Sequence, residues 1–318
     1  MKRSLAAMAV FGSLALIQPS AAQHGKEDLP TPWGPQDQIG AANRMTPERV
    51  LEAVKLVTEG KMYSLGIVID RETPAFPPGF LSVTILQPNQ TGTSGLGDNA
   101  FTYNDEIFMG WLGIGSHMDG LGHAGINHLY YGGRRVEDFA DAEGLTELGL
   151  HNLSGIVARG VLLDMAGYYG VDIVEEGRAY TAEDVKGAAK RQGVELREGD
   201  VVLFHSNWME LLDGENPDRE RFAAGEPGLG VSAANYLADI GVIAVGADTW
   251  AVEAVPAESA GETYPVHQIL LTRNGIYLLE NMDTRELAAD EAWEFLFVLG
   301  HPRLRGTSQM IINPIAIR

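Results

Sequence analysis

The chain has 318 residues, of which 45% are hydrophobic, and this length is sufficient to bury a sizeable core. It has no cysteine, so disulfides, thiolate metal ligands and a cysteine nucleophile are excluded. The formal net charge of −20 argues against nucleic acid as a partner, and it is otherwise typical of a soluble protein dispersed by its charge.

The N-terminus has the pattern of a bacterial signal peptide. Two basic residues precede an apolar run from Leu5 to Ile17, and a small-residue segment ends at Ala22. The run is too short to span a bilayer comfortably. We therefore expect a signal peptide over residues 1–22, and a mature chain that is periplasmic or secreted and free of the membrane. A retained anchor or a buried first helix is the alternative.

Past residue 22 the chain shows no repeat of fixed period and no hydrophilic linker, so we predict one domain over residues 23–318. Cap residues and terminal glycines predict helices over Thr46–Gly60, Thr181–Gly193 and Ser232–Gly241. Apolar, β-branched runs predict strands over Leu65–Ile69, Leu81–Leu86, Val161–Asp164, Val201–Phe204, Val242–Gly246, Ile276–Leu279, Phe295–Leu299 and Met310–Ile317. This alternation indicates an α/β fold with a mixed sheet and flanking helices.

Two imidazoles and a carboxylate fall between Gly115 and His123. His117 and Asp119 are separated by one residue, so in an extended segment their side chains leave on the same face, as a metal ion or a polarised water requires. His123 can reach the same pocket after a bend at the intervening glycines. A hydrogen-bonded His–Asp pair beside a tight turn is the plainer interpretation.

A second imidazole and carboxylate, His267 and Glu280, stand far down the chain. We expect His267 to open a short helix that is closed by Asn274-Gly275, and a strand to run back from there to Glu280. The outward helix and the returning strand are then each about 10–17 Å long. The two side chains can then share one end of the fold. A helix-capping histidine and a strand-end salt bridge are the alternatives.

The segment from Gly113 to His123 resembles the signature HxGTHxDxPxH of the cyclase-like metal-dependent hydrolases, which include bacterial arylformamidase (kynurenine formamidase) and isatin hydrolase. His117, Asp119 and His123 match the second His, the Asp and the last His of this signature. Gly113 stands where the family has its first His. The likeness extends from about Trp33 to the C-terminus, and its other matching parts are Arg159–Asp164, Gly199–Trp208, and His267 followed by Gly275–Asn281.

This resemblance implies a swivelling β/β/α fold and a divalent metal held by His117, Asp119, His267 and Glu280. It also implies that His123 is the acid/base and that the protein forms a homo-oligomer. In arylformamidases the first His is a metal ligand, and Gly113 has no side chain to replace it. With no cysteine available, the ligands are imidazole, carboxylate and water, which Zn²⁺ or Mn²⁺ fits best.

We therefore expect a metal-dependent amidohydrolase that cleaves a C–N bond of an amide, a formamide or a cyclic amide. A metal ion of this kind lowers the pKa of a bound water from ~16 towards ~7 and polarises the carbonyl under attack, while a histidine transfers the proton. Two alternatives stay open. One is a degenerate family member that binds a small metabolite without turnover, which the glycine at 113 suggests, and the other is a metal-dependent lactone or ester hydrolase.

Other residues near the motifs have weaker interpretations. Phe108 and Trp111 are candidates to line an apolar pocket for an aromatic substrate, or else belong to the core. Asp248 follows an expected strand, where it either faces a ligand or caps a turn. Ser116 lacks GxSxG surroundings and is expected to be a turn hydroxyl. The remaining histidines are expected to be surface or structural residues: His24, His128, His151, His205 and His301.

Overall fold

The computed structural model describes residues 29, 31–75, 79–87 and 95–318. The predicted signal peptide, residues 1–22, lies outside this part of the chain. Within it, no helix has both the length and the apolar character needed to cross a membrane.

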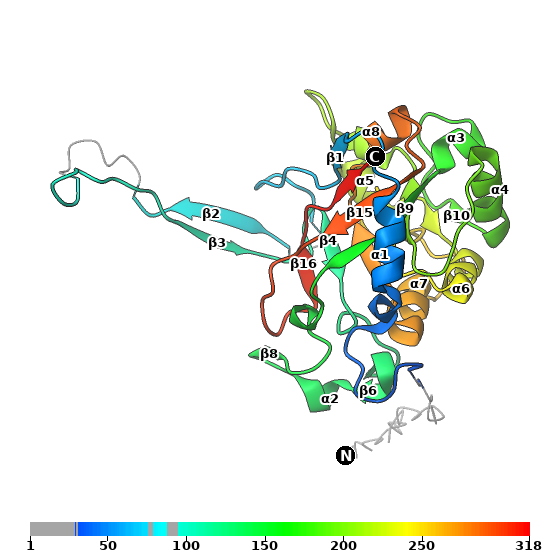
Figure 1. Cartoon of the computed structure of the whole chain (residues 1–318), viewed down its shortest axis with the longest axis horizontal. Coiled ribbons are helices and arrows are strands. Elements are labelled where there is room, and N and C mark those ends of the chain that lie inside the picture. Colours follow the sequence, from blue (N-terminus) through cyan, green and yellow to red (C-terminus); the bar gives the residue numbers. More distant parts are fainter. Residues whose placement is uncertain (1–28, 30, 76–78, 88–94) are drawn as a thin grey trace, which may run out of the picture.

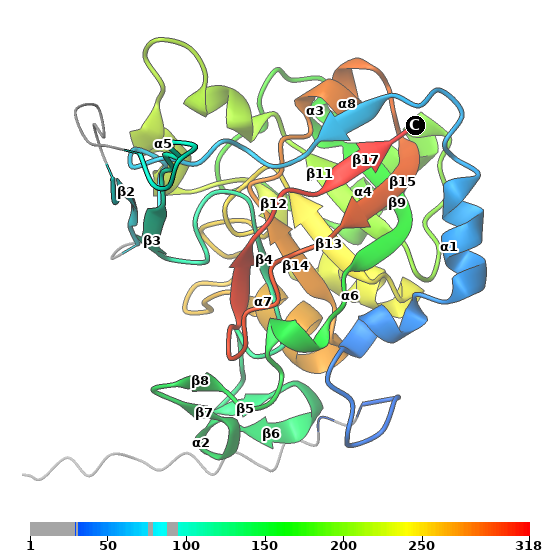
Figure 2. The same cartoon turned by 60° about the vertical axis from the view of Figure 1, so that its left-hand side comes forward.

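A nine-stranded mixed sheet forms the centre of the molecule, in the order β1-β17-β15-β9-β11-β13-β14-β4-β16 (Figures 1 and 2). Strands β9, β11, β13 and β14 are parallel, and the strands on either side of these four pair in antiparallel fashion. The bounds are β1 (Met62–Ser64), β4 (His117–Asp119), β9 (Ile156–Asp164), β11 (Val201–His205), β13 (Ala244–Ala247), β14 (Tyr277–Glu280), β15 (Glu294–Leu299), β16 (Gln309–Ile311) and β17 (Ile315–Ile317).

The sheet has a hydrophobic core on each face, because successive residues of a strand point to opposite sides. Leu162 and Leu203 belong to one core, and their chain neighbours Leu163 and Phe204 belong to the other. Both faces are covered, which explains why the parallel strands read as continuous apolar runs. The second core is covered by α4 (Ala182–Gln192), α6 (Val231–Ile240) and the π-helical segment η5 (Gln268–Arg273).

The sheet is strongly curled. Strands β16 and β17 lie towards opposite ends of the strand order, yet only residues 312–314 separate them in the chain. A segment of this length spans at most about 14 Å. Met118 of β4 and Ala316 of β17 also share one core. The two ends of the sheet therefore come close together around that core, and the predicted α/β fold with a mixed sheet and flanking helices is confirmed.

The remaining elements are shorter and surround the sheet. Helix α1 (Pro47–Val54) packs against β9 and β15. The other helices are η1 (Gly40–Arg44), η2 (Tyr131–Gly133), α2 (Val136–Phe139), η3 (Leu150–Asn152), α3 (Met165–Tyr169), η4 (Trp208–Leu212), α5 (Arg219–Ala224), α7 (Pro265–His267) and α8 (Arg285–Ala289). Pairs of strands form four small sheets, which are β2 (Leu81–Ile85) with β3 (Glu106–Gly110), β5 (Leu129–Tyr130) with β6 (Arg134–Arg135), β7 (Ala140–Asp141) with β8 (Gly144–Leu145), and β10 (Ala179–Tyr180) with β12 (Gly228–Leu229).

The three predicted helices are present, with corrections to their ends. Helix α4 has the expected capping box between Thr181 and Asp184 and ends before Gly193. Helix α6 begins one residue before Ser232, with Gly230 as its cap. Helix α1 ends at Val54 rather than at Gly60, because the next amides bond carbonyls three residues back and tighten the chain into turns.

Two strand predictions are wrong. The segment predicted as Leu65–Ile69 follows β1 and is not a strand, because the amide of Ile67 bonds the hydroxyl of Ser116 instead of a ladder partner. The predicted strand Met310–Ile317 is two strands, since Pro314 cannot donate to a ladder.

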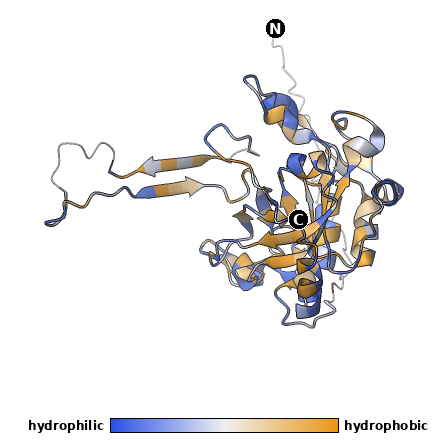
Figure 3. Ribbon diagram, turned by 45° about the horizontal axis from the view of Figure 1, so that its top comes forward, coloured by the Kyte–Doolittle hydropathy of each residue, from blue (hydrophilic) through white to orange (hydrophobic). Residues whose placement is uncertain are grey.

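The predicted strand Leu81–Leu86 forms as β2 but lies outside the main sheet. It pairs with β3, and the two extend away from the body as an arm (Figures 1 and 3). We use the word arm for the described residues between 79 and 111. Apolar residues alternate along β2 and are consecutive at Ile107–Met109 of β3, and many of these side chains are exposed (Figure 3).

Candidate metal centre

Strand register places four polar side chains of the site together, three of which were predicted from the sequence. Strand β4 lies between β14 and β16, with His117 opposite Glu280 and Asp119 opposite Gln309. Directly opposed residues of antiparallel strands share one face, and positions two apart on a strand share that face too. His117, Asp119, Glu280 and Gln309 therefore project from the same side of this end of the sheet.

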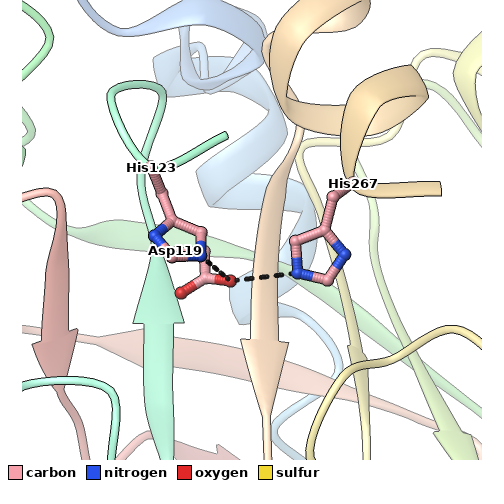
Figure 4. Close-up of side chains that lie close together, drawn as sticks. All are labelled: Asp119, His123 and His267. Atoms are coloured by element: carbon pink, nitrogen blue, oxygen red, sulfur yellow. Dashed lines mark ion pairs between the residues drawn. The ribbon is translucent and has the colours of Figure 1, made fainter. Parts of the chain in front are cut away.

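The two other predicted residues come from outside the strands. His123 follows a turn after β4 in which its amide bonds the carbonyl of Gly120. His267 ends the short helix α7, and η5 continues from it towards β14, as the predicted outward and return path requires. Figure 4 shows Asp119 between the rings of His123 and His267.

The ligand-type atoms of these residues face one another closely. Nε2 of His117 is 3.0 Å from Oε2 of Glu280 and 3.6 Å from Oδ1 of Asp119. Nε2 of His267 is 3.5 Å from Oδ2 of Asp119 and 3.5 Å from Oε1 of Glu280. Nε2 of His123 is 3.7 Å from Oδ2 of Asp119. The structure thus brings together all five residues singled out from the sequence.

The hydrogen bonds of the rings fix which nitrogens face the carboxylates. Nδ1 of His117 lies 2.8 Å from the carbonyl of Gly115, and Nδ1 of His267 lies 2.6 Å from a carboxylate oxygen of Glu253. Both partners only accept, so each Nδ1 carries a proton and each Nε2 is directed into the site.

The electrostatics couple the rings to the carboxylates. Burial alone would lower the pKa of His117, but the charges of Glu280 and Asp119 outweigh it and raise the pKa to about 9. The pKa of His267 is raised well above its usual value, since Asp119, Glu253 and Glu280 outweigh its burial. The pKa of Asp119 is lowered, because the three histidines outweigh its own burial. The carboxyl group of Asp119 is therefore held in its charged form, which binds metals, while a metal ion at the two imidazoles would displace the protons that the carboxylates favour.

The residues present fit a divalent metal ion. Two groups of three residues could each hold an ion, because each residue offers one ligand atom and the three atoms lie within 4.8 Å of one another. One group is Asp119, His123 and His267. The other is His117, Asp119 and Glu280. Among the described residues, Oδ2 of Asp119 and Oε1 of Glu280 are buried and have no hydrogen-bond partner. Unsatisfied buried carboxylate oxygens are costly unless a cation satisfies them. Tetrahedral bonds of about 2.0–2.1 Å separate ligand atoms by about 3.3–3.4 Å, close to the spacings found around His267.

Two residues of the centre were not found from the sequence. Glu253 is buried beneath His267, and besides the ring it accepts the amides of Val266 and His267. Gln309 donates from Nε2 to Oδ1 of Asp119 at 2.8 Å. An acid inside the apolar stretch around Glu253 was a usable signal of burial, whereas nothing in the local sequence marks Gln309.

A cavity of about 630 Å³ opens onto these side chains. Its lining includes all five predicted residues and an aromatic set consisting of Trp111, Phe222, Trp250 and Tyr264. The prediction for Trp111 is therefore confirmed. Phe108 is neither in this lining nor in the core, because it lies on the arm with 47% of its surface exposed.

The remaining polar candidates have structural roles. Ser116 has a structural role but is not the expected turn hydroxyl, because it accepts the amide of Ile67 and donates to the carbonyl of Asn281, both far from it in the chain. Asp248 caps a turn by accepting the amides of Ser206 and Trp208, so the capping interpretation holds. His205 is bonded to Thr284, His301 to the carbonyl of Leu150 and His151 to Arg305, while His128 is exposed and His24 lies outside the described residues.

The fold is that of known cyclases and hydrolases. A structure described as a novel cyclase is 29% identical and has a TM-score of 0.82, with 90% of this chain and 98% of that chain covered. An isatin hydrolase bound to the product analogue thioisatinate is 16% identical with a TM-score of 0.60, and the match covers 86% and 98% of the two chains. A predicted metal-dependent hydrolase from Bacillus stearothermophilus is 20% identical with a TM-score of 0.52, covering 80% and 97%.

These neighbours define a cyclase-like fold, and the His/Asp/Glu cluster is a candidate divalent-metal site within it. The family described as putative cyclase matches residues 63–254, which is more than half of the chain, and this protein belongs to it. Among curated proteins, none matches the chain.

Proposed function

We propose that this protein is a metal-dependent hydrolase that cleaves the C–N bond of an amide, a formamide or a cyclic amide. The observation that carries the proposal is the pair of unpartnered carboxylate oxygens, Oδ2 of Asp119 and Oε1 of Glu280, each 3.5 Å from Nε2 of His267. These oxygens make no hydrogen bond and face the ring only at ion-pair distance, so a divalent cation that displaced the imidazole proton would bond the nitrogen and both oxygens directly.

In this proposal His117, Asp119, His267 and Glu280 hold the ion, which is Zn²⁺ or Mn²⁺. When bound, the ion supplies Lewis acidity towards the carbonyl and lowers the pKa of a bound water. His123 is the acid/base that passes a proton from the attacking water to the leaving nitrogen. Its side chain is 31% exposed and lines the cavity, whereas those of the four ligands are almost fully buried.

The lining of the cavity supports a small aromatic substrate. Trp111, Phe222, Trp250 and Tyr264 form its aromatic part beside the polar cluster. Apolar walls with a few convergent polar groups are typical of small-molecule sites.

The test is hydrolysis of a panel of N-formyl aromatics, lactams and lactones by dialysed protein, with and without added Mn²⁺ or Zn²⁺. We expect turnover of an amide-type member that depends on the added metal. The proposal fails if every substrate stays intact while the folded protein holds metal.

Gly113 motivates a second candidate, a family member that binds a small metabolite without turning it over. Elemental analysis after dialysis against excess metal separates the two, because this candidate predicts protein without bound divalent metal. A lactone or ester hydrolase with the same centre differs in the leaving group, and the lactones of the panel test it.

We also propose that the mature chain is exported and begins near Gln23. The signal-peptide pattern of residues 1–22 supports this. N-terminal sequencing of protein from the periplasm or medium checks it, and an intact Met1 on the exported protein would contradict it.

A further inference from the structure

Gly113 is packed where a side chain would otherwise stand. A Cβ placed on Gly113 would lie 2.6 Å from Nε2 and 2.8 Å from Oε1 of Gln309. Contacts this short are not found for real Cβ atoms. The amide of Gln309 therefore occupies the space over Gly113, where the resembling signature has its first histidine.

Gln309 reaches this space from a distant part of the chain. Strand β16 pairs with β4 so that Gln309 lies directly opposite Asp119, and Nε2 of Gln309 donates to Oδ1 of Asp119 at 2.8 Å. Asp119 is fully buried. Its two oxygens therefore differ, because Oδ1 has a donor and Oδ2 has none among the described residues.

This difference determines which oxygen is available for a cation. With Oδ1 held by the amide, Oδ2 faces Nε2 of His267 at 3.5 Å and Nε2 of His123 at 3.7 Å. An amide hydrogen bond is directional, and it fixes the rotation of the carboxylate so that Oδ1 stays beside Nε2 of His117 at 3.6 Å while Oδ2 points between His123 and His267. It adds no charge to the cluster.

We propose that Gln309 is a positioning residue of the metal centre, which replaces the missing first histidine of the signature by orienting Asp119 instead of donating a ligand of its own. This inference rests on the proposed metal site. It differs from the family pattern in assigning the role to a residue near the C-terminus, which becomes part of the centre only through the pairing of β16 with β4.

Two variants remove the contact in different ways. Gln309→Met keeps most of the side-chain volume but has no amide donor. Gly113→Ala keeps the glutamine and displaces its amide, since the added methyl group would lie within 3 Å of three of its atoms. Gln268→Met is the matched control, because Gln268 lines the same cavity but donates to the carbonyl of Gly125.

The measurements are the Kd of the intact protein for Zn²⁺ and Mn²⁺ by chelator competition, and the visible spectrum of the Co²⁺ form. We expect Gln309→Met and Gly113→Ala to weaken metal binding about 10–100-fold, the usual effect of losing an outer-shell partner. We also expect both to alter the Co²⁺ spectrum. Gln268→Met should stay within about threefold of the wild type, and thermal unfolding of the metal-free proteins checks that each variant is folded.

Wild-type Kd values and Co²⁺ spectra in both contact variants would overturn the inference, as would an equal loss of affinity in Gln268→Met. If Gln309→Met does not fold, Gly113→Ala decides the matter alone. If the wild-type protein binds no metal, the proposed function fails as well. If the wild type binds metal and hydrolyses a substrate while both variants bind equally well, the role of Gln309 alone is refuted.

Discussion

The orientation of His267 depends on a single buried carboxylate. Glu253 accepts from the ring Nδ1 at 2.6 Å and from the backbone amides of Val266 and His267. A carboxylate behind a histidine fixes the tautomer of the ring and increases its basicity as a ligand. Glu253 therefore holds both the backbone of α7 and the ring of His267, a residue of the candidate metal centre.

We predict that Glu253→Gln weakens binding of Zn²⁺ or Mn²⁺ about 10–100-fold, because a neutral amide supports the ring less well than a carboxylate. Glu258→Gln is the control, since Glu258 accepts the amide of Val231 at the start of α6 and does not contact the site. Chelator competition measures both variants. An unchanged affinity in Glu253→Gln would show that the carboxylate only caps the helix.

At the scale of residues, the sequence predicted the side chains that carry chemistry but not the ones that support them. His117, Asp119 and His123 were visible as one short pattern, and His267 and Glu280 as a second. Glu253 contacts His267 through tertiary packing, and Gln309 contacts Asp119 through strand register. The apolar neighbours of Glu253 indicate only that it is buried, and neither residue belongs to a motif. A glutamine becomes a partner of Asp119 only when β16 lies beside β4.

At the scale of elements, the packing between strands β9 and β15 depends on a glycine. Gly160 of β9 lies directly opposite Phe295 of β15, and a Cβ on Gly160 would lie 2.1 Å from the nearest atom of that ring. The buried ring covers the glycine and takes the place of its side chain. A close ring over a bare backbone is a known way to stabilise glycine within a sheet.

We predict that Gly160→Ala lowers the free energy of unfolding by about 1–3 kcal/mol, since the fully packed ring must move to admit a methyl group. Gly300→Ala is the control at the end of the same strand pair, because no atom lies within 4 Å of its Cβ position. That variant should be neutral or slightly stabilising. Urea unfolding of both proteins checks the difference, and equal stabilities would contradict the packing argument.

The elements were predictable where a local signal and the fold agree. The capping box of α4 and the apolar runs of β9 and β11 are such cases. The strand prediction for the segment after β1 was wrong because Ile67 and Ile69 contact Gly115 and Ser116 in the loop before β4 instead of pairing in a sheet. The division of β16 from β17 was readable from Pro314, which breaks any ladder that includes it.

At the scale of the whole molecule, the sequence predicted the class of fold but not the curl of the sheet. Strand order depends on pairings between distant segments, such as β4 with β14 and β16. The sequence contains no signal for such pairings beyond the apolar character of each strand. The curl brings both ends of the sheet together, whereas the pairing of β4 with β14 and β16 joins segments from distant parts of the chain at the candidate metal centre.

The arm carries most of the large apolar side chains that are exposed in the described part of this acidic molecule. Residues 79–111 contain three acidic residues and no basic residue, in a chain of net charge −20. The exposed apolar side chains on it are Phe80, Val83, Ile85, Leu86, Leu96, Phe101, Tyr103, Ile107, Phe108, Met109 and Trp111. Exposed apolar side chains gathered in this way are typical of a contact surface, and a second copy of the chain would bury them against its own arm.

We therefore predict a homo-oligomer in which the arm contacts a second copy. Light scattering after size-exclusion chromatography should give a mass of two or more chains, and higher salt should strengthen assembly by screening the repulsion between two acidic chains. The double variant Val83→Glu/Phe108→Glu, at an opposed pair of the arm, should shift the protein to monomers. Val68→Glu, at an apolar residue that is 93% exposed outside the arm, should not. A monomeric wild type, or arm variants that assemble normally, would show that the arm serves another purpose.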